Sequence, residues 1–388
     1  MPAFGINNVG LGVVFIIFAV QCLLITRQVN ERRKKESNEE SKTHFREGVF
    51  NGILTSVILV SIGLIYIITG LGVLLFNNTA EAGGKLLYPV PTDSFALYFL
   101  SFLIIFIGIF VIYEYLTEKN IKNPPSEQKI HKLDLEVSRK AFHVLIIGIL
   151  AVYLVVGGLV TDSLYNYLTD PIFSMYQYDT IDLKAINDGQ LWTMFGVTAV
   201  FEFCFLTDLI RIKAPRWYPA RMISNMYREK EKETLGPHIY LVAGILFAII
   251  VFPAPVAMAV IAVSGLGDAA ATIVGVTKGK HKIRPKVSKK SWEGCIAGML
   301  ASFIFGFIAY VAVAFKYAVI AFNDYDTPYN IGNIISMGLI ISAAAVPVFF
   351  AIDYFTPTPL PFSDNLLNPI LIGFTMWGIY ELLKIGFM

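Results

Sequence analysis

Residues 295–315 read CIAGMLASFIFGFIAYVAVAF, a run without a single charged side chain. A helix rises about 1.5 Å per residue, so this run is long enough to cross the roughly 30 Å hydrocarbon core of a bilayer. Its apolar residues are continuous rather than alternating, which favours a helix over a strand of a membrane barrel. The stretch therefore predicts a membrane-spanning helix.

Similar apolar runs recur along the chain and give ten candidate spans. Only 15% of the 388 residues are charged, whereas soluble domains carry about 25%. Pro253 and Pro255 separate the sixth and seventh runs and predict a tight turn between them. The predicted fold is an all-α, polytopic integral membrane protein with about ten transmembrane helices. The spans are centred on Ile17, Ile62, Ile105, Leu150, Val200, Phe247, Ile261, Phe305, Ile341 and Met376.

The cationic residues are concentrated in four loops, which hold 27 of the 31 lysines and arginines. With ten spans these loops all fall on one side of the membrane, which the positive-inside rule makes the cytoplasmic side. The acidic loop Asp353–Asn368 is predicted on the same side, and both termini outside. The four loops are Arg27–Gly48, Thr117–Lys140, Arg211–Pro237 and Val276–Trp292.

The location and partners follow from the same pattern. The first run carries its positive charge after it, so we expect a retained anchor rather than a cleaved signal peptide. The expected location is the cell membrane, or the endoplasmic reticulum in a eukaryote. Topology and anionic lipid account for basic loops, so no nucleic-acid partner is expected. The three cysteines lack paired spacing, so neither a disulfide framework nor a zinc site is expected.

The first chemical motif is EVSRKAFH, residues 136–143, at the entrance of the fourth span. On a helix Arg139 and His143 are four positions apart and share a face with each other. Basic residues at a cytoplasmic helix entrance often serve only as topology anchors. A histidine one turn deeper favours a functional role, because ionisable groups at membrane depth usually have one.

The strongest motif is GLGDAAATIVG, residues 265–275, near the cytoplasmic end of the seventh span. Its small residues allow close approach either by another helix or by a phosphate group. Helix packing alone would not require Asp268, and a carboxylate there is unfavourable unless it binds a cation or another partner. The motif therefore predicts a functional aspartate.

The next motif is SKKSWEG, residues 288–294, in which two lysines precede the first turn of a helix. Helix N-termini bind phosphate through free backbone N–H groups, and lysines add positive charge. The P-loop spacing is absent, so that fold is not predicted. The alternative is a basic helix entrance that only fixes topology.

The last motif is DNLLNP, residues 364–369, in a loop without lysine or arginine. Magnesium prefers oxygen ligands and leaves room for phosphate oxygens. An acidic loop beside lysine-rich loops therefore predicts a magnesium site, the alternative being a simple helix cap by Asp364.

Together, these motifs resemble those of the CTP-dependent lipid kinases, which comprise dolichol kinase, phytol kinase and the CTP-using diacylglycerol kinase. The matching elements are SRKAFH, GLGDAAATIVG with the following GK, KKSWEG and DNLLNP, in the family's order. They imply a catalytic domain over residues 131–388, preceded by spans without a motif over residues 1–130. Where the family pattern has a glutamate before the DN loop, this chain has Asp353.

The resemblance implies phosphoryl transfer from CTP, with Mg²⁺, to the hydroxyl of a membrane lipid alcohol of the dolichol or polyprenol type. A homo-oligomer is compatible with it. The catalytic residues would be Asp268, Lys290, Asp364 and His143. The Mg²⁺ ligands would be Asp268, Asp364 and Asn365. The nucleotide-binding residues would be Arg139, Lys140, Gly267, Gly275, Lys280, Lys289, Ser291, Glu293 and Gly294.

Two other functions stay open. The related phosphatidate cytidylyltransferase would use the same triphosphate site but attach CMP to a lipid phosphate. Its aspartate-rich signature is missing after Gly294, which favours the kinase. A transporter would also bury charges, but near the bilayer midplane rather than at one face.

Overall fold

The computed structural model is helical throughout its regular structure, apart from one isolated bridge between Lys282 and Ser291. The predicted all-α, polytopic membrane fold is thereby confirmed. The structure describes residues 2–76, 143, 146–156, 159, 188–214, 218, 234–285, 290–324, 331–356 and 360–387.

The helices run in the following order. The first part of the bundle contains α1 (Pro2–Lys35), α2 (Glu39–Phe76), the π-helical segment η1 (Val152–Val156), α6 (Asp188–Lys213) and α8 (Pro237–Val251). The second part contains α9 (Ala254–Ala262), the π-helical η4 (Val263–Gly267), α10 (Asp268–Thr277), α11 (Trp292–Asp324), α12 (Ile331–Phe355), α13 (Asp364–Leu367), the π-helical η5 (Asn368–Ile372) and α14 (Gly373–Phe387).

Seven helices in the described part of the chain are long and apolar enough to cross a membrane. Two shorter apolar helices, Ile146–Val156 and Pro237–Val251, lie at the fourth and sixth predicted spans. The third predicted span, centred on Ile105, lies outside the described residues. The turn predicted at Pro253 is present, since α8 ends at Val251 and α9 begins at Ala254.

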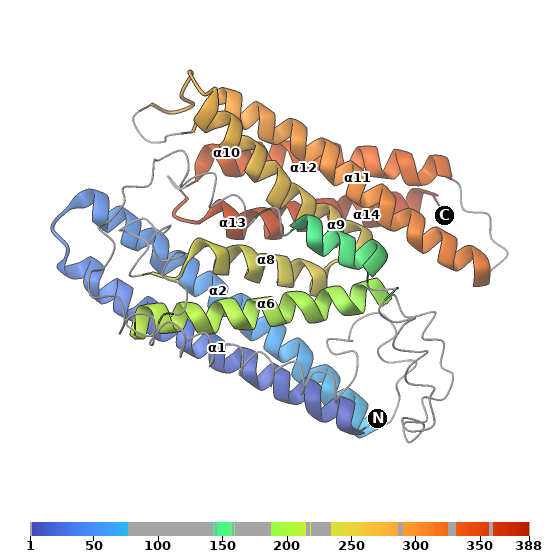
Figure 1. Ribbon diagram of the computed structural model, residues 1–388, viewed down its shortest axis with the longest axis horizontal. Coiled ribbons are helices and arrows are strands. Elements are labelled where there is room, and N and C mark those ends of the chain that lie inside the picture. Colours follow the sequence, from blue (N-terminus) through green and yellow to red (C-terminus); the bar gives the residue numbers. More distant parts are fainter. Residues whose placement is uncertain are drawn as a thin grey trace, which may run out of the picture.

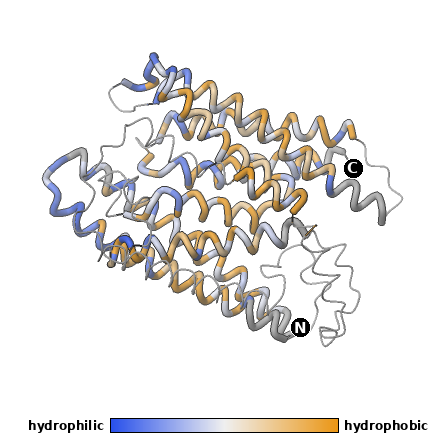
Figure 2. Tube along the Cα trace, viewed as in Figure 1, coloured by the Kyte–Doolittle hydropathy of each residue, from blue (hydrophilic) through white to orange (hydrophobic). Residues whose placement is uncertain are grey.

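Most of the helices that carry motifs have the motif at the same end of the bundle. The α1–α2 turn, the start of α11 and α13 lie toward this end, and the labelled N and C termini lie toward the other (Figure 1). Hydrophilic residues are concentrated at the same end as the α1–α2 turn (Figure 2). We call this end the polar end.

Hydrogen bonds tie the helix ends together at the polar end. The ammonium of Lys213, at the end of α6, donates to Gln28 of α1 over 2.7 Å. The backbone N–H of Ser363, before α13, donates to Oδ1 of Asn51 in α2 over 2.8 Å. Helices far apart in sequence therefore end at a common level, as the single-sided distribution of basic loops predicts.

A buried ion pair fixes the connection from α6 to α8. Nε of Arg211 lies 2.6 Å from Oδ1 of Asp208, and both side chains are almost fully buried. Arg211 also donates to the carbonyl of Thr234, and Asp208 accepts from the N–H of Gly236. Because every partner is satisfied, the pair can hold the start of α8 in place at low net cost.

The side of the membrane that the polar end faces is open to a direct test. In a background lacking Cys22, Cys204 and Cys295, Lys278→Cys should react with an impermeant maleimide only after the cells are permeabilised. Lys278 is exposed at the polar end, and the positive-inside rule places that end in the cytoplasm. Lys384→Cys, exposed near the end of α14, is the matched control and should react in intact cells. The reverse pattern would contradict the orientation.

Candidate active site

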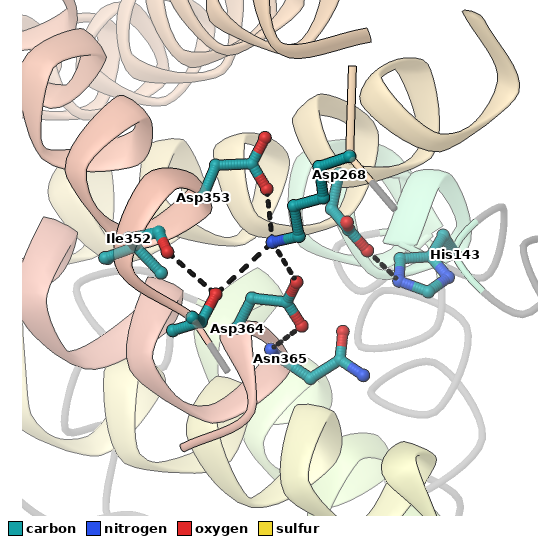
Figure 3. A network of polar contacts seen from close by, with 8 residues as sticks. His143, Asp268, Ile352, Asp353, Asp364 and Asn365 are labelled. Carbon is teal, nitrogen blue, oxygen red and sulfur yellow. Dashed lines mark hydrogen bonds and ion pairs between the residues drawn. The ribbon is translucent and has the colours of Figure 1, made fainter. Parts of the chain in front are cut away.

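The ammonium of Lys290 lies at the centre of a polar cluster at the polar end. Its Nζ is 2.5 Å from Oδ1 of Asp353 and 3.0 Å from Oδ2 of Asp364. It also donates to Oγ1 of Thr356 over 3.3 Å, and that hydroxyl donates to the carbonyl of Ile352 over 2.7 Å (Figure 3). One cation therefore joins the start of α11, the end of α12 and the start of α13.

The backbone around Lys290 is held by a short hairpin. The N–H of Ile283 donates to the carbonyl of Lys290, and the N–H of Trp292 donates to the carbonyl of His281. Burial alone would lower the pKa of the Lys290 ammonium, but the charges of Asp364 and Asp353 raise it above its ordinary value. Lys290 is therefore charged at neutral pH and compensates the carboxylates around it.

Asp268 pairs with His143 beside this cluster. Nε2 of His143 lies 3.1 Å from Oδ2 of Asp268, and both side chains are more than nine-tenths buried. Asp268 directly follows the π-helical segment η4, and such wide turns are frequent at functional sites. Asp268 and Asp364 are both within electrostatic range of Asp353, so three carboxylates share this end of the bundle (Figure 3).

The glycines of the two motifs serve helix packing. A Cβ on Gly294 would lie 2.6 Å from the carbonyl oxygen of Ala271 and 2.8 Å from Cα of Gly275. A Cβ on Gly267 would collide with the hydroxyl of Ser302. Of the two explanations for the small residues, close approach of α11 to α10 is therefore the one observed. The proposed nucleotide contacts of Gly267, Gly275 and Gly294 remain predictions.

The start of α13, which carries Asp364 and Asn365, is held from both sides. The N–H of Asn365 donates to Oδ1 of Asp364 over 3.0 Å, and Nδ2 of Asn365 lies 3.5 Å from the carbonyl oxygen of Pro237. Asn51, from the segment to which no motif was assigned, accepts the N–H of Ser363. The first helices of the chain thus help to position Asp364.

Other predicted nucleotide-binding residues have local roles or lie away from the cluster. Oγ of Ser291 accepts the N–H of Gly294 over 3.3 Å, as a helix cap does. Glu293 lies 2.6 Å from Nδ1 of His281 and accepts the N–H of the same residue. Lys280 is exposed, and Arg139, Lys140 and Lys289 lie outside the described residues.

Two residues of the site, Asp353 and Thr356, received no role from the sequence, and Arg284 lies near the end of α12. Asp353 was noted as the start of the acidic segment and as a departure from a family pattern, yet it makes the shortest contact with Lys290. Thr356 follows it at the end of the same span. The guanidinium of Arg284 lies 4.9 Å from the ring centroid of Tyr354, and its Nε and Nη2 are buried without a hydrogen-bond partner among the described residues.

The donor set suits a magnesium ion that is shared with a phosphate ligand. Among the described residues, no group of three or more His, Cys, Asp or Glu side chains converges closely enough to hold a metal by itself. Asp353 and Asp364 nevertheless direct two carboxylate oxygens at one cation, the Lys290 ammonium. Magnesium typically binds one or two carboxylates together with substrate phosphates, so the residues fit it in that mode.

The cluster predicts a coupled effect on stability. Lys290→Met should lower the free energy of unfolding by roughly 1–3 kcal/mol, between the values for exposed and buried ion pairs. Adding Asp364→Asn should cost less than the sum of the single changes, because it removes one of two facing carboxylates. Unfolding in mixed micelles measures both, with the exposed Lys278→Met as the control. Strictly additive changes would show that the three side chains do not act as one cluster.

Comparisons with known proteins identify the family of the chain. The sequence profile described as the cytidylyltransferase family matches residues 93–348, more than half of the chain. No curated protein and no solved structure matches the chain significantly. The matched range contains His143, Asp268 and Lys290, and Asp353 and Asp364 follow it directly. The chain is therefore a CTP-using membrane enzyme that belongs to the cytidylyltransferase family.

Proposed function

We propose that this enzyme transfers the γ-phosphate of CTP to the hydroxyl group of a membrane lipid alcohol of the polyprenol type. The observation that carries the proposal is the buried pair of His143 and Asp268, 3.1 Å apart, beside the Lys290 cluster. The family assignment favours an enzyme over the transporter considered from the sequence.

The acceptor determines whether a base is needed. The hydroxyl of an alcohol must lose its proton as its oxygen attacks phosphorus, and a positioned carboxylate or histidine accelerates such a step by about 10²–10⁴. A lipid phosphate is already ionised at neutral pH, so a cytidylyltransferase needs no base for its nucleophile. A buried aspartate held by a histidine is therefore better explained by an alcohol acceptor.

The chain's own residues account for the steps of the transfer. Asp268 accepts the proton of the lipid hydroxyl, and His143 lies beside the carboxylate, with its Nε2 3.1 Å from Oδ2. The new bond joins the lipid oxygen to the γ-phosphorus, and the bond from that phosphorus to the bridging oxygen of CDP breaks. Lys290 binds the triphosphate. Lys280, Lys289, Arg139 and Lys140 supply further positive charge.

Magnesium would be held by Asp353 and Asp364, with Asn365 beside them and Asp268 as a further candidate. When bound, it would neutralise part of the charge on the triphosphate, which is the main demand of phosphoryl transfer. Lys290, which contacts both carboxylates, would supply further positive charge for the phosphates.

The competing proposal is a CDP-lipid synthase, which the family assignment equally allows. It would use the same lysines and carboxylates, but a lipid phosphate would attack the α-phosphorus and release pyrophosphate. Binding of CTP cannot separate the two reactions, because both require it.

The fate of each phosphorus atom separates the two reactions. Purified protein is incubated with CTP labelled at the γ-position in one tube and at the α-position in another, with polyprenol, diacylglycerol or phosphatidate. We expect label in the lipid phase from γ-labelled CTP only, and with polyprenol. Transfer from α-labelled CTP to phosphatidate would replace the kinase by the synthase.

The proposed base gives a second test. Asp268→Asn should reduce transfer to polyprenol by about 10²–10⁴, because an amide of equal size cannot accept the proton. His143→Gln should cause a smaller loss, since the carboxylate stays. Glu202→Gln, which changes a buried carboxyl on α6 away from the cluster, is the matched control and should stay active. If Asp268→Asn keeps more than about a tenth of the activity, a barrier change below about 1.4 kcal/mol, Asp268 is not the base.

A further inference from the structure

An apolar groove lies beside the last two turns of α12, at the polar end of the bundle. Its volume is about 280 Å³, and almost all of its exposed lining is apolar. Pro347, inside α12, is one of its walls, and proline cannot donate the helical hydrogen bond at that turn. The lining residues are Pro347, Val348, Ala351, Ile352, Phe355, Leu360 and Leu371.

The groove is open on the surface that faces lipid. Phe355, Leu360 and Leu371 remain 43%, 39% and 42% exposed. Phe355 and Leu371 belong to the two membrane spans Ile331–Phe355 and Asp364–Lys384. Exposed apolar side chains are ordinary on a membrane span, so exposure alone indicates nothing. This surface differs because it contains a groove at the level of the active site.

The groove and the active site share a wall. Ile352 lines the groove, and its carbonyl oxygen accepts the hydroxyl of Thr356 over 2.7 Å. The oxygen of the same hydroxyl accepts a hydrogen bond from the ammonium of Lys290 over 3.3 Å. The next residue on α12 is Asp353, which contacts Lys290 directly. The apolar surface therefore ends two hydrogen bonds away from the cation at the centre of the cluster.

We propose that this groove binds the hydrocarbon chain of the polyprenol-type substrate next to its hydroxyl group. The proposal rests on the proposed function and adds the route by which the substrate reaches the site. Pockets that enclose whole small molecules measure about 300–1,000 Å³. A groove of about 280 Å³ therefore holds only the first segment of the chain, while the rest stays in the bilayer.

The role of such a groove is positioning. Lipid chains are as apolar as the groove, so moving a chain from bilayer to groove gains little hydrophobic free energy. A lipid chain that packs against α12 would instead fix the position of its own hydroxyl group. Small displacements of a reacting group can reduce the rate of transfer about 10²-fold. Filling the groove should therefore weaken use of the lipid without changing use of CTP.

Photocrosslinking tests the site without any turnover. A polyprenol with a diazirine in its first isoprene unit is irradiated with the full-length protein in phospholipid nanodiscs, without CTP. We expect crosslinked peptides from residues 347–371, competed by excess polyprenol but not by phosphatidylcholine. Crosslinks spread over all lipid-facing helices, or insensitive to polyprenol, would overturn the proposal. Displacement by phosphatidate rather than polyprenol would overturn the assigned occupant.

A pair of substitutions on one helix gives the matched comparison. Ala351→Trp fills the groove and should reduce crosslinking at least fivefold and raise the KM for polyprenol about tenfold, with the KM for CTP unchanged. Ala343→Trp, on an exposed position of α12 outside the groove, should change neither. Equal effects of both substitutions would overturn the proposal. Crosslinking that behaves as expected while γ-label transfer fails would leave the groove in place and remove only the proposed function.

Discussion

The structure of the site depends on one charge balance, the Lys290 ammonium between the carboxylates of Asp353 and Asp364. Ions that lose contact with water cost several kcal/mol unless partners compensate them. Here the partners belong to the end of α12 and the first turn of α13. Without a cation between them, the two carboxylates would repel each other unless one of them were protonated. In the proposed function, the same balance suits a metal ion and a triphosphate, because their opposite charges compensate each other when both bind.

Irregular helical turns then decide where the remaining groups lie. Asp268 follows the π-helical segment η4, and the short helix of Asp364 continues into η5, where Pro369 lies. A regular helix would rotate each side chain to a different face. Gly294, pressed against Ala271 and Gly275, lets the start of α11 approach α10 and brings Lys290 to the level of Asp268. The glycines of the motifs thus act on the site through the backbone.

The sequence was sufficient where one physical demand dominates. Long uncharged runs predict membrane helices, and ionisable groups near membrane depth need partners, so His143 and Asp268 could be selected. Lys290 was selected as a cation before a helix start, and Asp364 as an oxygen ligand in an acidic segment. The pairing of Lys290 with Asp353 could not, because 63 positions separate them and the contact depends on how α12 packs beside α11. From the sequence alone, Ser291 and Glu293 could equally contact a ligand, whereas in the structure Ser291 caps α11 and Glu293 contacts His281. Only their local geometry favours a structural role.

The helices without a motif also help to position the candidate site. Asn51 of α2 accepts the N–H of Ser363, and the N–H of Leu360 donates to the carbonyl of Phe355. The loop between α12 and α13 is therefore fixed at one end to the N-terminal helices and at the other to the wall of the groove. In the proposed function the groove offers a lipid chain little more than the bilayer does, so selection among lipids would depend on how the chain places its hydroxyl at the cluster. Ile352 of the groove and Asp353 of the cluster are neighbours on α12, whereas Asp364 comes from α13, whose start is bonded to Asn51 of α2. The first helices of the chain therefore act on the cluster through the position of α13.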